Sequence, residues 1–260
     1  MIDRELTAIR YLQPFRQGGS VPALVQADDG ELYVLKFHAA AQGSRALVAE
    51  LLAGEIGRSL GLRIPELALI NVAPNFGMGE AHQEIRETLN ASAGLNLGMR
   101  FVPDAFDFNP ALAPPPAPEE AAAIVWFDAY ITNVDRTPRN VNMLLRAGEL
   151  WLIDHGSALY FHHNRAWLDQ PERALTPFAL IKDHALLPVA GSVTAADAAL
   201  QPELTREVIE GAVSRLPDAG LADGAPPAEL RAGYRRWLTD RAASSHVFVE
   251  EAENARARRV

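Results

Sequence analysis

The chain has 260 residues, of which 48% are hydrophobic and 22% are charged, and this suits one large domain or two lobes around a cleft. Its net charge of −9 disfavours general binding to nucleic acids or to acidic membranes, whose phosphates would repel it. The absence of cysteine excludes disulfides, thiolate catalysis and cysteine metal sites.

The first segment alternates loosely between apolar and polar side chains over residues 6–15, which predicts a strand. Small residues follow it, where a backbone can approach phosphates closely. A plain hairpin turn is the interpretation that these residues favour by themselves, because they do not form a G-x-G-x-x-G pattern. These small residues are Gly18, Gly19 and Ser20.

Two further strands are predicted at 23–27 and 31–37, on either side of an Asp-Asp-Gly turn that is a strong hairpin signal. The second of these strands carries one lysine, Lys36, among apolar neighbours. Most lysines in strands point to solvent. A lysine on a strand directly after a glycine-containing loop can instead reach the phosphates of a nucleotide.

Apolar residues at intervals of three and four predict a helix from Ser44 to Leu60, which Gly61 ends. The helix contains two candidate acids. At 100° per residue, Glu55 projects into the middle of the apolar stripe, whereas Glu50 falls on the other side. One of the two is expected to be a solvated glutamate.

The next segments are predicted as a strand at 67–72, a short helix near 80–90 and a strand at 96–102. Five prolines between residues 109 and 118 indicate a stiff, extended linker. Pro118 and the two acids after it then open a long helix, since proline and acidic side chains are favoured in a first turn.

The stretch 124–156 carries the strongest chemical signal: an apolar helix, a polar loop, a hairpin and a terminal Asp-His-Gly. Phosphoryl transfer requires an acid that orients the attacking hydroxyl and oxygen ligands for Mg²⁺. Asp135 and Asn140 have the five-residue spacing that kinases use, and Asp154 follows a strand and precedes a glycine-containing turn. Such spacings are common by chance, so the surrounding elements carry the prediction.

The remaining chain is predicted to be irregular over 164–193 and helical over 194–216 and 227–260. His162 and His163 suggest a metal site, but no third ligand has a fixed spacing, and zinc is not favoured. Charges close to the N-terminus argue against a signal peptide, and no apolar run approaches the roughly 18 residues of a membrane span. We therefore expect a cytoplasmic protein.

The chain resembles the HipA-like kinases, a branch of the protein-kinase-like and phosphatidylinositol-kinase-like superfamily. The resemblance covers about residues 10–165 and rests on GGSVPALVQADDGELYVLKF at 18–37, AELLAGEIGRSLGLRIPE at 49–66, the Asp135/Asn140 loop and IDHG at 153–156. It implies an ATP-dependent phosphotransferase with a two-lobed α+β fold. The small lobe (1–108) would hold an antiparallel sheet and one helix, a linker (109–118) would follow, and the large catalytic lobe (119–260) would be mostly helical.

The resemblance also implies roles for individual residues, with ATP and Mg²⁺ as cofactors. Lys36 would contact phosphates and be held by Glu50, which aligns better with the family's glutamate than its rival Glu55. Asp135 would orient the acceptor hydroxyl, and Asn140 and Asp154 would bind the metal. Contacts with the nucleotide would come from Gly18, Gly19, Ser20, Phe101 and Val102.

The sequence does not identify the acceptor of the phosphoryl group. A Ser or Thr of a protein is expected, while aminoglycoside and choline kinases share a similar Asp-x-x-x-x-Asn layout and suggest a small molecule. A nucleotide-binding pseudokinase is the alternative from another class, because the loop lacks a His-Arg-Asp triplet and His155 replaces the phenylalanine of Asp-Phe-Gly. Toxins of the family carry a further N-terminal region, for which there is no room before Gly18, so neither toxin activity nor a DNA-bound partner is expected.

Overall fold

The computed structural model describes residues 5–15, 22–37, 43–80, 82–221 and 224–258. Its strands are β1 (Leu6–Pro14), β2 (Ala23–Ala27), β3 (Leu32–Lys36), β4 (Leu67–Val72), β5 (Gly94–Arg100), β6 (Phe106–Asp107), β7 (Met143–Arg146) and β8 (Glu149–Leu152). Its α-helices are α1 (Gly43–Ser59), α2 (Gln83–Ala91), α3 (Pro118–Tyr130), α4 (Val193–Leu200), α5 (Arg206–Ser214), α6 (Pro227–Ala243) and α7 (Ser245–Ala257).

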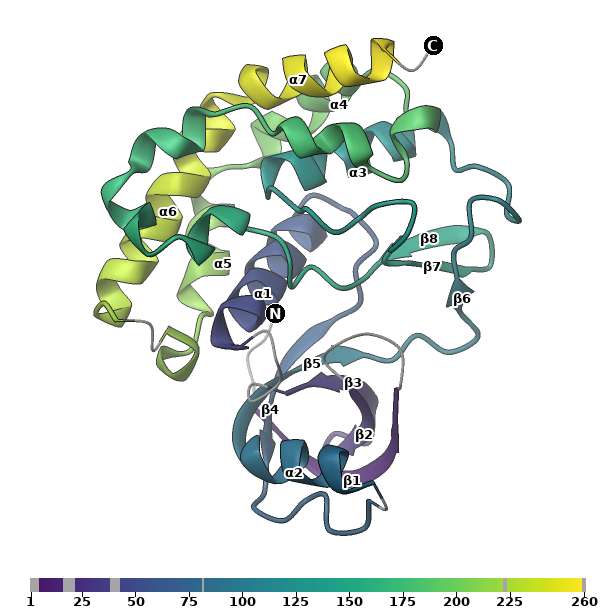
Figure 1. Ribbon diagram of the computed structural model, residues 1–260, viewed down its shortest axis with the longest axis vertical. Coiled ribbons are helices and arrows are strands. Elements are labelled where there is room, and N and C mark those ends of the chain that lie inside the picture. Colours follow the sequence, from purple (N-terminus) through teal and green to yellow (C-terminus); the bar gives the residue numbers. More distant parts are fainter. Residues whose placement is uncertain (1–4, 16–21, 38–42, 81, 222–223, 259–260) are drawn as a thin grey trace.

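Five strands form a closed barrel in the order β1-β2-β3-β5-β4, at the lower end of the molecule in Figure 1. Neighbours in the barrel are antiparallel except β1 and β4, which pair in parallel with Leu6 opposite Ile70. The predicted antiparallel sheet is therefore corrected to a barrel with one parallel contact. Closure leaves no open edge in this sheet, and its interior is filled by apolar side chains such as Val25, Leu35 and Ile70.

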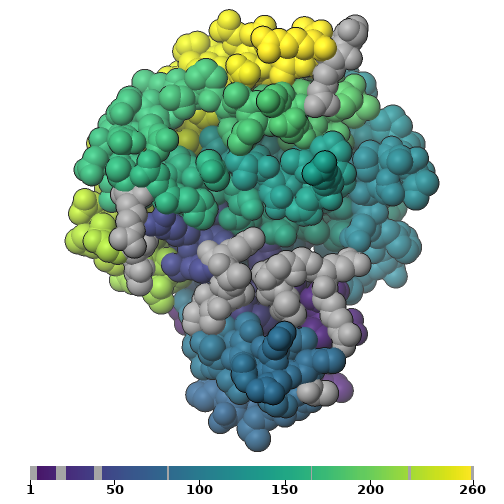
Figure 2. Space-filling view, viewed as in Figure 1, coloured from purple at the N-terminus to yellow at the C-terminus, as the bar shows by residue number. Residues whose placement is uncertain are grey.

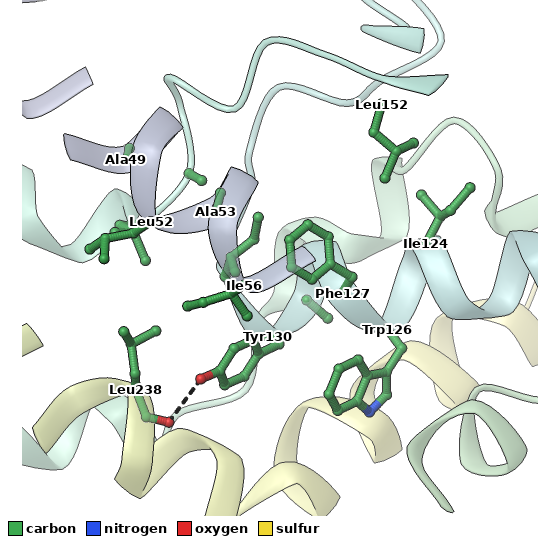
Figure 3. Close-up of a cluster of buried hydrophobic side chains, with 14 of the residues drawn as sticks. Ala49, Leu52, Ala53, Ile56, Ile124, Trp126, Phe127, Tyr130, Leu152 and Leu238 are labelled. Carbon is green, nitrogen blue, oxygen red and sulfur yellow. Dashed lines mark hydrogen bonds between the residues drawn. The ribbon is translucent and has the colours of Figure 1, made fainter. Parts of the chain in front are cut away.

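The helix α2 lies against the barrel, whereas the other α-helices gather at the opposite end, which Figure 2 shows as broader than the barrel. Their core is continuous with α1, because residues of α1 and α3 belong to one cluster of buried apolar side chains. In Figure 3, Ile56 of α1 lies beside Phe127 and Tyr130 of α3. Gly57 permits this close packing, since an added Cβ would lie 2.9 Å from the ring of Phe127.

The C-terminal end of α3 is fixed by a buried arginine from α6. Arg241 is 1% exposed and donates hydrogen bonds to the carbonyls of Tyr130 (2.8 Å) and Ala129 (2.8 Å). It also donates to the carbonyls of Ala174 and Thr176. The last carbonyls of a helix have no partners within the helix, so this cation satisfies them and sets where the following loop begins.

Several predicted boundaries require correction. The last barrel strand begins two residues earlier than predicted, at Gly94, and ends at Arg100. The linker is not extended throughout, because the amides of Leu112 and Ala113 donate to the carbonyl of Asn109 and form a turn. The predicted helix at 194–216 is divided into α4 and α5, and the one at 227–260 into α6 and α7, which meet at Ser244.

The segment between β8 and α4 is built from short 3-10 helices rather than from irregular chain. They are η1 (Tyr160–His163), η2 (Arg165–Asp169), η3 (Pro171–Leu175), η4 (Ala179–Asp183) and η5 (Leu187–Val189). Further short ones are η6 (Gln201–Glu203) and η7 (Asp218–Leu221). Within the described residues, no helix is long and apolar enough to cross a membrane.

Candidate active site

Lys36 lies at the end of β3 and contacts two acids from distant parts of the chain. Its Nζ is 2.6 Å from Oε2 of Glu50 on α1 and 2.7 Å from Oδ1 of Asp154, just after β8. Burial alone would lower the pKa of Lys36, but the charges of the two acids raise it above its usual value. The lysine is therefore held as a cation between the barrel and the hairpin.

The two glutamates of α1 are both buried, so the expectation that one is solvated is wrong. Glu50 is 1% exposed and pairs with Lys36, whereas Glu55 is 7% exposed and pairs with Arg215. Burial would raise the pKa of Glu50, yet Lys36 and His155 together lower it to about 2. Each buried acid is thus compensated by its own cation, which is the usual condition for burying a charge.

Asp154 adopts a left-handed backbone conformation with φ of 55°, and its side chain is 44% exposed. The next residue, His155, is fully buried, with its ring edge-on to Phe127 and its Nδ1 3.7 Å from Oε1 of Glu50. His155 thus packs between α1 and α3. The arrangement leaves the carboxylate of Asp154 partly open to solvent while its neighbour is anchored in the core.

Asp135 and Asn140 lie in the loop after α3 and contact each other. The Nδ2 of Asn140 donates to Oδ2 of Asp135 at 2.8 Å, and the amide of Asp135 donates to Oδ1 of Asn133 at 3.1 Å. Backbone hydrogen bonds between Thr137 and Asn140 close the turn that separates them. The five-residue spacing therefore brings the two polar groups together in space.

A buried ion pair supports this loop. Arg136 is 1% exposed, and its Nε donates to Oδ2 of Asp128 at 2.5 Å. Its Nη1 donates to the carbonyls of Asn142 and Ile153. Burial would raise the pKa of Asp128, but the charge of Arg136 and a hydrogen bond from His184 hold that pKa well below its usual range. Arg136 therefore connects the loop to the residue that precedes Asp154.

Left-handed backbone conformations of non-glycine residues recur in this stretch. Thr132 has φ of 50°, Asn142 has φ of 49° and Asp154 has φ of 55°. Such a conformation is least favourable for a β-branched residue such as threonine. Strained backbone of this kind clusters at functional sites, where the surrounding structure holds it in place.

The remaining predicted nucleotide contacts are placed only in part. Gly18, Gly19 and Ser20 lie outside the described residues. Phe101 follows β5, and its amide already donates to the carbonyl of Leu32 at 2.8 Å, so that amide is not available to an adenine. Val102 follows it in the connection to β6.

The donor atoms present suit a hard cation. Carboxylate oxygen from Asp154 and amide oxygen from Asn140 are ligands that Mg²⁺ prefers, and the exposure of Asp154 leaves room for a further ligand. In the described part of the chain, no group of three or more His, Cys, Asp and Glu residues could hold a metal. Two protein ligands of this kind would suit a metal that takes its other ligands from phosphate and water.

Comparison with known proteins identifies the class of protein to which this chain belongs. A family model of HipA-like kinases matches residues 8–170, more than half of the chain, so the chain belongs to the HipA-like kinase family. It is therefore a kinase-like phosphotransferase, and membership implies the general use of ATP and a divalent metal. The predicted resemblance is confirmed.

One solved structure is similar over nearly the whole length. It is the crystal structure of a proinflammatory kinase, CtkA, from Helicobacter pylori, with 14% sequence identity, a TM-score of 0.57 and 98% of each chain covered. At this identity the likeness concerns the fold alone. No curated protein matches the sequence.

Sequence reasoning missed three residues of the site region, namely Asp128, Arg136 and His184. One signal was available, because Asp128 is a charged residue inside a helix that is otherwise apolar from Ala121 to Ile131. A charge at such a position requires a buried partner. The partners themselves were not predictable, since His184 lies 56 residues further along the chain.

Proposed function

We propose that this kinase-like protein transfers the γ-phosphoryl group of ATP to the hydroxyl of a serine or threonine in a protein. The observation that carries the proposal is the pair of contacts at Lys36, which is bound at once by Glu50 of α1 and by Asp154 of the Asp-His-Gly segment. Active kinases require the pairing of such a lysine with a helix glutamate, and they place the aspartate of the second element on magnesium beside the phosphates.

The proposed roles follow from this arrangement. The ammonium group of Lys36 would bind the phosphates, with Glu50 fixing its position. Asp154 and Asn140 would hold the magnesium, which supplies charge neutralisation at the phosphates. The amide nitrogen of Asn140 contacts Asp135, so its amide oxygen is the atom for the cation.

The carboxylate of Asp135 would orient the acceptor hydroxyl and accept its proton. Gly18, Gly19 and Ser20 would contact phosphates, and the backbone at Phe101 and Val102 would contact adenine through the Phe101 carbonyl or through Val102. The cleft would lie between a small lobe (1–108) and a large lobe (119–260), joined by the linker at 109–118. Location in the cytoplasm remains a prediction.

Transfer of labelled phosphate from ATP tests the proposal. Wild-type protein with Mg²⁺ should label a protein acceptor or itself. Asp135→Asn should lower turnover by about 10²- to 10⁴-fold while leaving the melting-temperature rise with Mg-ATP nearly intact, because orienting the nucleophile matters in the transition state. Asp169→Asn, which changes an exposed acid at the end of η2, is the matched control.

The outcomes separate the alternatives. A melting-temperature rise with Mg-ATP but no transfer to any acceptor would identify a pseudokinase. Label found only in a small hydroxyl compound would replace the protein acceptor with a small molecule. Absence of any shift at millimolar Mg-ATP in a folded sample would refute nucleotide binding altogether.

A further inference from the structure

The carboxylate of Asp128 is the centre of a sealed polar network beneath the candidate active site. Its Oδ1 accepts a hydrogen bond from Nδ2 of Asn133 at 3.0 Å. Its Oδ2 accepts two, from Nε of Arg136 at 2.5 Å and from Nε2 of His184 at 2.8 Å. All four residues are buried, at most 4% exposed, so the three hydrogen bonds take the place of solvation of this acid.

Two arms lead from Asp128 to the two acids of the site. Through Oδ1 the first arm holds Asn133, whose Oδ1 accepts the amide of Asp135 at 3.1 Å. Through Oδ2 the second arm holds Arg136, whose Nη1 donates to the carbonyl of Ile153 at 3.4 Å, one residue before Asp154. One buried carboxylate therefore acts on the positions of both acids.

His184 completes the network from a distant segment, directly after η4. Its Nδ1 accepts the amide of Leu186 at 3.0 Å, so the ring proton resides on Nε2, which donates to Asp128. The next amide, that of Ala185, donates to the carbonyl of Arg136 at 3.0 Å. This segment lies beyond residue 170, where the match to the family model ends.

We propose that His184 is a positioning residue that acts through Asp128 to fix the placement of Asp135 relative to Asp154. A one-ångström error in such a placement is sufficient to lower a rate strongly, because both groups must meet the same phosphoryl group. The backbone near the site also needs support, because Asn142 and Asp154 both have left-handed conformations. Arg136 binds the carbonyl of Asn142 itself and the carbonyl of the residue before Asp154. The catalytic part of this inference rests on the proposed kinase function.

The first measurement is a double-mutant cycle on turnover, made well below the melting temperature. His184→Ala should lower kcat by about 10- to 100-fold, as loss of a partner behind a metal ligand does, with the KM for ATP changing much less. In the Asp135→Asn background the same substitution should lower the residual rate less than about twofold, because it acts through an acid already disabled. His184→Gln, which retains a side-chain N–H, should recover part of the rate.

The control is Leu230→Ala, which truncates a buried side chain of α6 outside the network. The comparison is made at temperatures equally far below each melting temperature. Loss of packing alone should reduce turnover little in both the wild-type and the Asp135→Asn backgrounds. An effect of His184→Ala that is equal in the two backgrounds would overturn the proposal, and so would a rate loss no larger than that of the control.

A second measurement is independent of activity, so it stands even where the kinase proposal fails. Hydrogen exchange of backbone amides should accelerate over 133–136 and 152–156 in His184→Ala, and less in His184→Gln, while Leu230→Ala leaves these segments unchanged. Unchanged exchange in both segments would refute the positioning role. Accelerated exchange together with a wild-type protein that neither binds nor transfers phosphate would uphold the network and reject the kinase function.

Discussion

Two clusters of ionisable side chains contact the segment from Asp128 to Asp154, and they differ in their access to solvent. The cluster of Lys36, Glu50 and Asp154 is open on one side, because the side chain of Asp154 is 44% exposed. The cluster of Asp128, Arg136 and His184 is closed, with at most 3% exposure at any member. Each cluster contains one buried acid, Glu50 or Asp128, whose pKa is lowered because a cation lies beside it.

The difference indicates a division of labour between the clusters. An open cluster can exchange a protein contact for a contact with a ligand, since water already reaches one of its members. A closed cluster cannot do so without leaving a buried charge unpaired, which is strongly destabilising. The open cluster is therefore suited to binding and the closed one to holding the loop in a single conformation.

The largest expected effect is on the closed cluster. Asp128→Ala should lower the free energy of unfolding by about 3–5 kcal/mol, because it leaves the buried guanidinium of Arg136 without its carboxylate. Urea unfolding followed by circular dichroism measures this loss. The control is Glu120→Ala, which removes a partly exposed ion pair with Arg63 and should change stability by less than about 1 kcal/mol. Equal losses in the two variants would contradict the distinction between sealed and exposed pairs.

Lowering the pH should have an intermediate effect on stability, through the open cluster. The pKa of Glu50 is lowered from 4.5 to about 2, so the unfolded chain takes up this proton at a higher pH than the folded protein does. The stabilisation is complete above about pH 4.5 and is lost as the pH falls towards about 2, by about 3 kcal/mol in all.

Comparison of wild-type protein with Glu50→Gln measures this contribution. The variant should be less stable near neutral pH, and the difference between the two proteins should shrink as the pH falls through that window. A difference that stays constant from pH 6 to pH 2.5 would show that Glu50 is not the group responsible.

The smallest expected change in stability is at Asp154. Asp154→Asn should alter the free energy of unfolding by less than about 1 kcal/mol, because the side chain is partly exposed and asparagine tolerates a positive φ. The same substitution should remove most of the Mg²⁺ dependence of the melting-temperature rise with ATP. A loss of stability as large as that of Asp128→Ala would place Asp154 among the structural acids instead.

The sequence was sufficient where the signal is local. The hairpin strands β2 and β3, the helix α1, the strand β4 and the start of α3 at Pro118 all follow from periodicity and from turn residues. Local spacing also brought Asp135 and Asn140 to the same loop. The choice between Glu50 and Glu55 needed the family pattern, because both lie on a helix that is buried on nearly every side.

Contacts between distant segments were not predictable. Closure of the barrel depends on pairing of β1 with β4, some sixty residues apart, and a period of two does not name a strand's partner. No proline or glycine marks the break at Ser244, beyond which α7 packs on the distant helix α3. In the same way, the position of Asp128 in an apolar helix predicts that it has a buried partner, but it does not predict that this partner is His184.

Membership of α1 in the core of the helical end has a mechanical consequence. Lys36 is carried by the barrel, whereas Glu50 is carried by a helix whose apolar side chains pack with α3. The core of the helical end also includes Leu67 of β4 and Leu97 of β5, so a rotation of the barrel against the helices would change both the 2.6 Å contact between Lys36 and Glu50 and the packing of these side chains. Because Lys36 also contacts Asp154, two ion pairs of one side chain join the barrel to the rest of the molecule, and a ligand that binds Lys36 would weaken both of them.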